Sequence, residues 1–196
     1  MTDILNARQL LDHLVSFPTV SCDTNLPLID FVRDYFAQHD IDSVVIPNED
    51  GTKAGLVAQV GPNVTGGVAL SGHSDVVPVE GQDWITDPWN VVEKDDRLYG
   101  RGTCDMKGFV ALAMAAMVKA KSMDLQRPLQ FALSRDEEVG LLGAPDVAKC
   151  LLDNFAKVEA VVVGEPTKMQ VVTGHKSCDD LQFHVRGQEV HSSRLH

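Results

Sequence analysis

The sequence LQFALSRDEEVGLLGAPDVAKCLLDNFAKVEAVVV, residues 129–163, places a helical pattern between two apolar runs. The runs Leu129–Ser134 and Val158–Val163 predict strands, and residues 143–154 predict the helix between them. Further strands are predicted at Ser43–Ile46, Leu56–Val60 and Val68–Ser71. Because predicted strands alternate with helices, we expect an α/β fold whose mixed, largely parallel sheet is flanked by helices.

The other segments carry helical or irregular patterns. Apolar stripes predict two helices within residues 4–15 and 28–36. The segment Phe109–Lys121 is rich in Ala and Met and apolar on most sides, which predicts a buried helix. Residues 78–96 hold two Trp, two Pro and many acids, and predict a long irregular loop.

The pattern changes after Gly174. Residues Asp180–Arg186 alternate apolar and polar side chains, as in a half-exposed strand. We therefore expect residues 1–174 to form one domain and residues 175–196 to begin a second.

Composition narrows the class of protein. The 196 residues are 44% hydrophobic, enough for a sizeable core, and the formal net charge is -11 without any block of Lys or Arg. A basic face for nucleic acid or an anionic membrane is therefore not expected. The longest apolar stretch, Phe109–Val118, is too short to span a bilayer. Four widely spaced cysteines predict reduced thiols and a cytoplasmic location. They are Cys22, Cys104, Cys150 and Cys178.

Acidic and imidazole side chains follow the predicted strands. The candidates are His73, Asp75, Asp105, Glu137, Glu138 and Glu165. Active sites of open α/β sheets lie at the carboxyl ends of strands, so we expect these residues to converge. Carboxylates and an imidazole are suitable metal ligands. The set therefore predicts a metal-dependent hydrolase.

Each candidate also has a structural explanation. His73 and Asp75 fit a metal-bound imidazole that is oriented by a carboxylate, although an exposed His-x-Asp pair without a role is more common. Asp105 follows Gly102 and precedes a helix, so it is either a ligand in a tight turn or a helix cap. Glu137 and Glu138 are either a general base beside a ligand or part of a solvated acidic turn.

Other chemistries have less support. Glu165 ends a very apolar run, which is harder to explain by solvation alone. His191 and Ser192 are adjacent and therefore rarely face each other, and no Gly-x-Ser-x-Gly turn is present, which argues against serine catalysis. Cysteine catalysis by Cys104 has no obvious partner His nearby in the sequence.

Taken together, the segments resemble a family of zinc hydrolases. The family includes acetylornithine deacetylase, succinyl-diaminopimelate desuccinylase, aminoacylase and related carboxypeptidases and dipeptidases. The matching segments run in order along essentially the whole chain: residues 71–78, 99–108, 136–138, 164–167 and 187–193. Each motif is weak alone, but their order and spacing make a chance match improbable.

The resemblance implies a site with two zinc ions, for which cobalt or manganese are possible substitutes. His73 and Glu165 would bind one ion, Asp105 would bridge both, and Glu138 would bind the second. Glu137 would be the general base for a metal-activated water, and Asp75 would orient His73. The family also implies a cis peptide bond after the bridging residue Asp105.

The resemblance further assigns His191 to the lid of the active site, where it would stabilise the oxyanion. Residues 1–174 would be the N-terminal part of the catalytic domain, and residues 175–196 the beginning of a lid or dimerisation domain. One departure from the family is Ser177, where members often have Gly, at the expected hinge into the lid.

The acetylornithine deacetylase branch is the most similar, on Gly-Arg-Gly-Thr-Cys-Asp-Met-Lys-Gly-Phe and Gly-Glu-Pro-Thr. It implies hydrolysis of N-acetyl-L-ornithine to L-ornithine and acetate in arginine biosynthesis. The alternative is another N-acyl-amino-acid deacylase, a dipeptidase or a carboxypeptidase on the same scaffold.

The family also implies a longer polypeptide and a homodimer that acts on a small N-acyl amino acid. The chain therefore resembles an N-terminal fragment. A last His ligand would lie beyond residue 196, so we expect the 196-residue chain alone to be poorly active.

Overall fold

The computed structural model describes residues 3–174 and 183–187. The chain divides into two units, Met1–Pro166 and Thr167–His196. In the second unit, the described residues form no helix or strand. The strand predicted at Asp180–Arg186 is therefore absent from its described residues, and its first three residues lie outside the described ranges. The predicted domain boundary at Gly174 stays a prediction.

The first unit is built on a five-stranded sheet with the order β1-β2-β6-β3-β7. Its strands are β1 (Ser43–Pro47), β2 (Ala54–Val60), β3 (Val68–His73), β6 (Leu129–Ser134) and β7 (Ala160–Val163). Strands β1, β2 and β6 pair antiparallel, whereas β3 pairs parallel with both β6 and β7. The expected mixed sheet is confirmed, but half of its pairings are antiparallel. No helix separates β1, β2 and β3 along the chain, so β1 and β2 pair as a hairpin.

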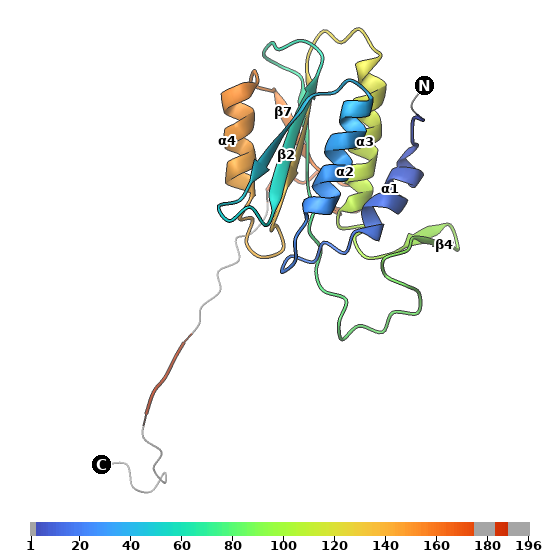
Figure 1. Cartoon of the computed structure of the whole chain (residues 1–196), viewed down its shortest axis with the longest axis vertical. Coiled ribbons are helices and arrows are strands. Elements are labelled where there is room, and N and C mark those ends of the chain that lie inside the picture. Colours follow the sequence, from blue (N-terminus) through green and yellow to red (C-terminus); the bar gives the residue numbers. More distant parts are fainter. Residues whose placement is uncertain (1–2, 175–182, 188–196) are drawn as a thin grey trace, which may run out of the picture. The chain divides into compact units, whose positions relative to one another are not determined.

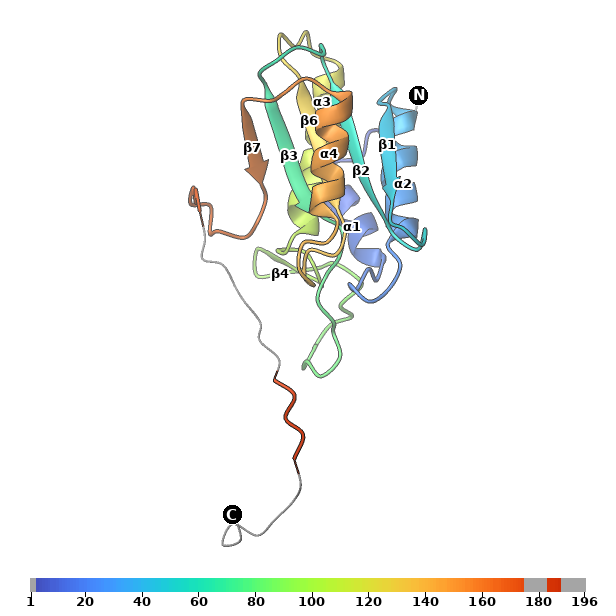
Figure 2. The same ribbon diagram turned by 90° about the vertical axis from the view of Figure 1, so that its left-hand side faces the viewer.

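Helices cover both faces of the sheet. Helices α1 (Ala7–Ser16), α2 (Leu26–Gln38) and α3 (Lys107–Lys121) lie on one side, and α4 (Ala144–Asn154) lies on the other (Figure 1). The prediction that α3 is buried is confirmed, because it packs between the sheet and α1 with Met114 and Met117 fully enclosed. This three-layer arrangement leaves the carboxyl ends of β3, β6 and β7 at one edge of the sheet (Figure 2).

The predicted irregular loop contains regular structure. Strands β4 (Val92–Lys94) and β5 (Arg97–Tyr99) form an antiparallel hairpin, whose first strand lies inside the segment that we expected to be irregular. Its turn consists of Asp95 and Asp96, with φ of 53° and 56°. Asp tolerates the left-handed region that a two-residue hairpin turn requires, so the Asp-Asp pair was the sequence signal for this hairpin.

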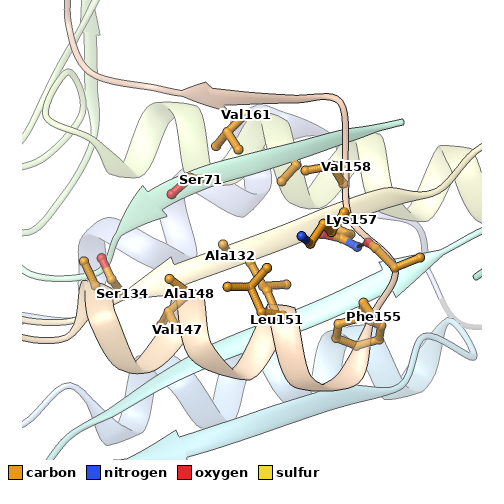
Figure 3. A pocket seen from close by; sticks show the side chains of 15 residues that line it. Ser71, Ala132, Ser134, Val147, Ala148, Leu151, Phe155, Lys157, Val158 and Val161 are labelled. Atoms are coloured by element: carbon orange, nitrogen blue, oxygen red, sulfur yellow. Dashed lines mark hydrogen bonds between the residues drawn. The ribbon is translucent and has the colours of Figure 1, made fainter. Parts of the chain in front are cut away.

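Strand β7 is the outermost strand beside β3 and borders an apolar groove. Val161, Val162 and Val163 are 47–58% exposed. The groove has a volume of about 560 Å³ and lies between β7, the neighbouring strands and α4, with Val147, Leu151 and other apolar side chains in its wall (Figure 3). Parallel strands are normally covered on both faces. Among the described residues, no helix covers β7 as α3 covers the centre of the sheet.

Gly67 sets the entry into β3, and replacing it with Ala is expected to destabilise the fold. Its φ is +81°, and a Cβ atom there would lie 2.1 Å from the carbonyl oxygen of Pro128. Left-handed strain and the steric clash together predict a loss of about 2–5 kcal/mol in the free energy of unfolding. Urea denaturation of G67A measures this loss.

Gly51 provides the matched control for G67A. Its φ is +70°, but a Cβ atom there would meet nothing within 4 Å. G51A is therefore expected to lose only the strain contribution, about 1–2 kcal/mol. Equal losses in G51A and G67A would show that the contact with Pro128 carries no cost.

Candidate metal centre

The parallel half of the sheet brings the predicted site residues to one edge. In the register of the strands, His73 lies opposite Ser134, and Ser71 lies opposite Val163. The acidic turn after β6 and the segment after β7 therefore begin beside His73. Asp105 reaches the same edge from the loop that precedes α3.

Three carboxylates surround one nitrogen of His73. The Nε2 atom lies 3.2 Å from Asp105 Oδ1, 3.7 Å from Glu165 Oε1 and 4.0 Å from Glu137 Oε2. Two groups of side chains place their ligand atoms within 4.8 Å of one another: His73 with Glu137 and Glu138, and His73 with Asp105 and Glu165. Five of the six residues predicted to converge thus meet in these groups, and His73 belongs to both.

The tautomer of His73 suits metal binding. Its Nδ1 donates a hydrogen bond to the carbonyl oxygen of Asp75 at 2.8 Å. A carbonyl oxygen only accepts, so Nδ1 carries the proton. In the neutral ring, Nε2 then presents a lone pair to the carboxylates, an arrangement that a cation between them would stabilise. This donor set therefore fits a divalent cation.

Asp75 supports the site differently from the sequence-based expectation. We expected its carboxylate to orient His73, but the backbone carbonyl of Asp75 has this role, and its Oδ1 lies 3.6 Å from Nδ1. The carboxylate is occupied elsewhere. It accepts the backbone N–H groups of Glu137 at 3.0 Å and Glu138 at 3.2 Å, and the hydroxyl of Ser21 at 2.6 Å.

The electrostatics of the site reflect crowded negative charge. Burial raises the pKa of Glu138, and the neighbouring Asp105 raises it further. Burial also raises the pKa of Glu165, although His73 opposes this effect. For His73, burial favours the neutral ring, but Asp75 and the nearby glutamates outweigh it, so the pKa lies above its usual value. A bound cation would offset this repulsion among the carboxylates.

The structure excludes one alternative explanation for Asp105. Helix α3 has Met106 at its N-cap and no side-chain capping bond, so Asp105 does not cap the helix. The peptide bond between Asp105 and Met106 is cis, as expected from the family resemblance.

Lys107, the first residue of α3, is buried, and its Nζ donates to the carbonyl of Phe17 at 2.7 Å. Burial lowers the pKa of Lys107 to about 7.

Sequence reasoning missed a buried polar network behind the site. Thr19 Oγ1 donates to the carbonyl of Ser74 at 2.6 Å, and Asn25 Nδ2 donates to Ser74 Oγ at 2.8 Å. Lys53 Nζ binds both the carbonyl of Ser21 and the carboxylate of Asp136. These partners are 32 to 83 residues apart in the chain, so no local pattern identifies them.

The structure describes three of the four cysteines and none of the candidate residues near the C-terminus. Cys22, Cys104 and Cys150 are free thiols, as expected. Cys178, Ser177, His191 and Ser192 lie outside the described residues, so the predicted lid role of His191 stays a prediction. In the described part of the chain, no helix has the length and apolar character needed to cross a bilayer.

Comparisons with known proteins agree with this geometry. Residues 69–191 match the sequence profile of peptidase family M20/M25/M40. An acetylornithine deacetylase of Myxococcus xanthus is 39% identical over 98% of this chain and 50% of its own length. An acetylornithine deacetylase of Pasteurella multocida (strain Pm70) is 31% identical over 98% of this chain and 51% of its own length. The chain thus spans about half the length of these curated relatives.

Solved structures support the fold. Human carnosine dipeptidase 1 has a TM-score of 0.66 at 24% identity, covering 80% of this chain and 38% of its own. The M20 family metallo-carboxypeptidase Sso-CP2 of Sulfolobus solfataricus has a TM-score of 0.67 at 17% identity, covering 84% and 37%. At these identities the likeness concerns the fold alone, and it agrees with the expected mixed sheet flanked by helices.

Proposed function

The chain belongs to peptidase family M20/M25/M40, and from this membership we propose that the protein is a metal-dependent amidohydrolase. The observation that carries the proposal is the convergence on His73 Nε2 of carboxylates from three separate segments. A solvated acidic turn explains Glu137 and Glu138 alone. It does not explain why Asp105 and Glu165 lie beside the same buried imidazole.

We propose that the site holds two divalent cations, with zinc as the expected metal. His73 and Glu165 would hold one ion, Asp105 would lie between both, and Glu138 would hold the other. When bound, such ions polarise an amide carbonyl and lower the pKa of water to about 7. The carboxylate chemistry of the site would also accept cobalt or manganese.

In this proposal Glu137 is the general base. Its carboxylate would take a proton from the attacking water and later donate a proton to the leaving amine nitrogen, so the residue ends the cycle ionised. Its side chain is 28% exposed, compared with 1% for His73, so it can reach both a substrate and the buried imidazole. His191 is proposed to stabilise the oxyanion from the lid.

The proposed substrate is N-acetyl-L-ornithine, hydrolysed to L-ornithine and acetate in arginine biosynthesis. The two curated relatives that carry the name acetylornithine deacetylase support this choice. The alternative is another N-acyl-amino-acid deacylase or a dipeptidase, and the likeness to a dipeptidase fold keeps this alternative open. A cytoplasmic homodimer without nucleic-acid or membrane partners completes the proposal.

Substrate profiling tests this proposal. A polypeptide of the relatives' full length that contains this sequence should release acetate from N-acetyl-L-ornithine faster than it hydrolyses succinyl-diaminopimelate or dipeptides. Preference for a dipeptide would replace the deacetylase proposal with its alternative. Absence of amide hydrolysis in the metal-loaded protein would overturn the amidohydrolase proposal itself.

The 196-residue chain gives a second prediction. We expect it to bind metal more weakly at the Glu138 position than at the His73–Glu165 position, because the proposed last His ligand is not among its residues. Its turnover is therefore expected to be low. Metal titration followed by elemental analysis measures the two affinities, and appreciable turnover by this chain would contradict the need for a further ligand.

A further inference from the structure

The carboxylate of Asp75 holds the backbone of the acidic pair. It is nearly fully buried, and its Oδ1 and Oδ2 atoms accept the N–H groups of Glu137 and Glu138, respectively. Hydrogen bonds to an ionised carboxylate are stronger than bonds between neutral groups. The positions of both glutamates along the edge of the sheet therefore depend on the orientation of this carboxylate.

Ser21 contributes the third donor to the same carboxylate. Its hydroxyl donates to Asp75 Oδ2 at 2.6 Å, and the residue is 7% exposed. The backbone around Ser21 is held independently of the hydroxyl. Ser21 N donates to the carbonyl of Val76 at 3.2 Å, and Val76 N donates to the carbonyl of Thr19 at 3.0 Å. The hydroxyl is thus presented to Asp75 from a backbone segment that has hydrogen bonds of its own.

We propose that Ser21 is a positioning residue for the acidic pair, acting through Asp75. This inference rests on the proposed function, in which Glu137 is the base and Glu138 a ligand. An ionised carboxylate has about four acceptor positions, and a buried one that loses a donor turns toward any other donor nearby. The proton on His73 Nδ1 is such a donor, because this nitrogen lies only 3.6 Å from Oδ1.

Removing the Ser21 hydroxyl therefore has two consequences. Asp75 Oδ2 retains only the N–H of Glu138 among the donors described above. The carboxylate is then free to rotate toward His73, which weakens its bonds to the amides of Glu137 and Glu138. Contacts made by the Ser21 backbone, including the bond from Lys53 to its carbonyl, do not need the hydroxyl.

Amide hydrogen exchange on the metal-free 196-residue chain tests the positioning role directly. In S21A, exchange at Glu137 and Glu138 is expected to accelerate about tenfold, the factor for losing one hydrogen bond to a charged group. Exchange in the centres of β3 and β6 should stay unchanged, which separates this effect from general destabilisation. S21T, which keeps a hydroxyl, should restore slow exchange.

Thr19 provides the matched control. It lies on the same segment, is 2% exposed, and donates its hydroxyl to the carbonyl of Ser74 rather than to Asp75. T19V also loses one buried hydroxyl, but it should leave exchange at Glu137 and Glu138 unchanged relative to the rest of the sheet. Equal acceleration in T19V and S21A would reduce Ser21 to an ordinary packing residue and overturn the inference.

Metal titration connects this role with the proposed function. With Zn²⁺ as the probe, S21A should bind about tenfold more weakly than the unmodified chain and T19V, in line with the typical effect of residues that support ligands. Unchanged affinity in S21A would overturn the inference while leaving the amidohydrolase proposal intact. Failure of the unmodified chain to bind Zn²⁺ would instead overturn the metal site, and the exchange experiment would still decide whether Ser21 holds the acidic pair.

Discussion

Replacing Glu137 with Gln is expected to reduce kcat by about 10²–10⁴-fold, the contribution typical of a general base. Gln preserves the size of the side chain and leaves the backbone N–H that donates to Asp75 in place. It cannot accept a proton from water at neutral pH. The measurement is kcat for acetate release by the metal-loaded polypeptide of the relatives' full length.

Metal content separates a base from a ligand in this experiment. Glu137 is close enough to His73 and Glu138 to bind a cation with them, so its role needs a direct test. E137Q should retain its metal while losing activity. Loss of both the metal and the activity would identify Glu137 as a ligand. The control E93Q removes a carboxylate from the exposed part of β4 and should retain both properties.

Replacing His73 with Ala is expected to lower Zn²⁺ affinity by more than about 100-fold at the proposed His73–Glu165 position. Loss of a residue that merely supports a ligand already costs about 10–100-fold. Its Nε2 atom lies near the carboxylates of Asp105 and Glu165, so removing the imidazole takes away the nitrogen ligand of this position. E165Q removes the charge of the other proposed ligand at this position and should weaken the same position, while the Glu138 position keeps its own carboxylate. Zinc titration of the two variants of the 196-residue chain measures both losses.

His13 offers a matched control for H73A. It lies exposed on α1 and stacks on Phe31, and it belongs to neither candidate ligand group. H13A should bind zinc as the unmodified chain does. If H73A kept its affinity, the cation site would not be centred on this imidazole, and the proposed arrangement of both ions would fail.

Much of the fold was predictable because apolar periodicity reports burial directly. The five sheet strands and four helices all appear close to their predicted positions, since each carries a continuous apolar run or stripe. The β4–β5 hairpin was missed because its short strands are largely exposed and carry no such run. The antiparallel half of the sheet was underestimated because alternation with helices holds only after β3.

The candidate site was predictable for a related reason. Parallel neighbours in a sheet bring their carboxyl ends to one edge, so residues that end or follow β3, β6 and β7 must meet. Their identities as His73, Glu137, Glu138 and Glu165 are local properties of the sequence. Their individual roles stay predictions, which the experiments above test.

The order of apolar runs and acids in this chain is sufficient to specify a mixed sheet with a candidate metal site at its edge, because both depend on local patterns and on strand direction. The partners of Asp75 are not specified in this way. Its carbonyl orients His73. Its carboxylate binds Ser21, which lies 54 residues earlier in the chain, and the backbone of Glu137 and Glu138, which lie 62 and 63 residues later. Such hydrogen bonds depend on how the folded segments pack, because a buried carboxylate takes whichever donors the tertiary structure brings within reach.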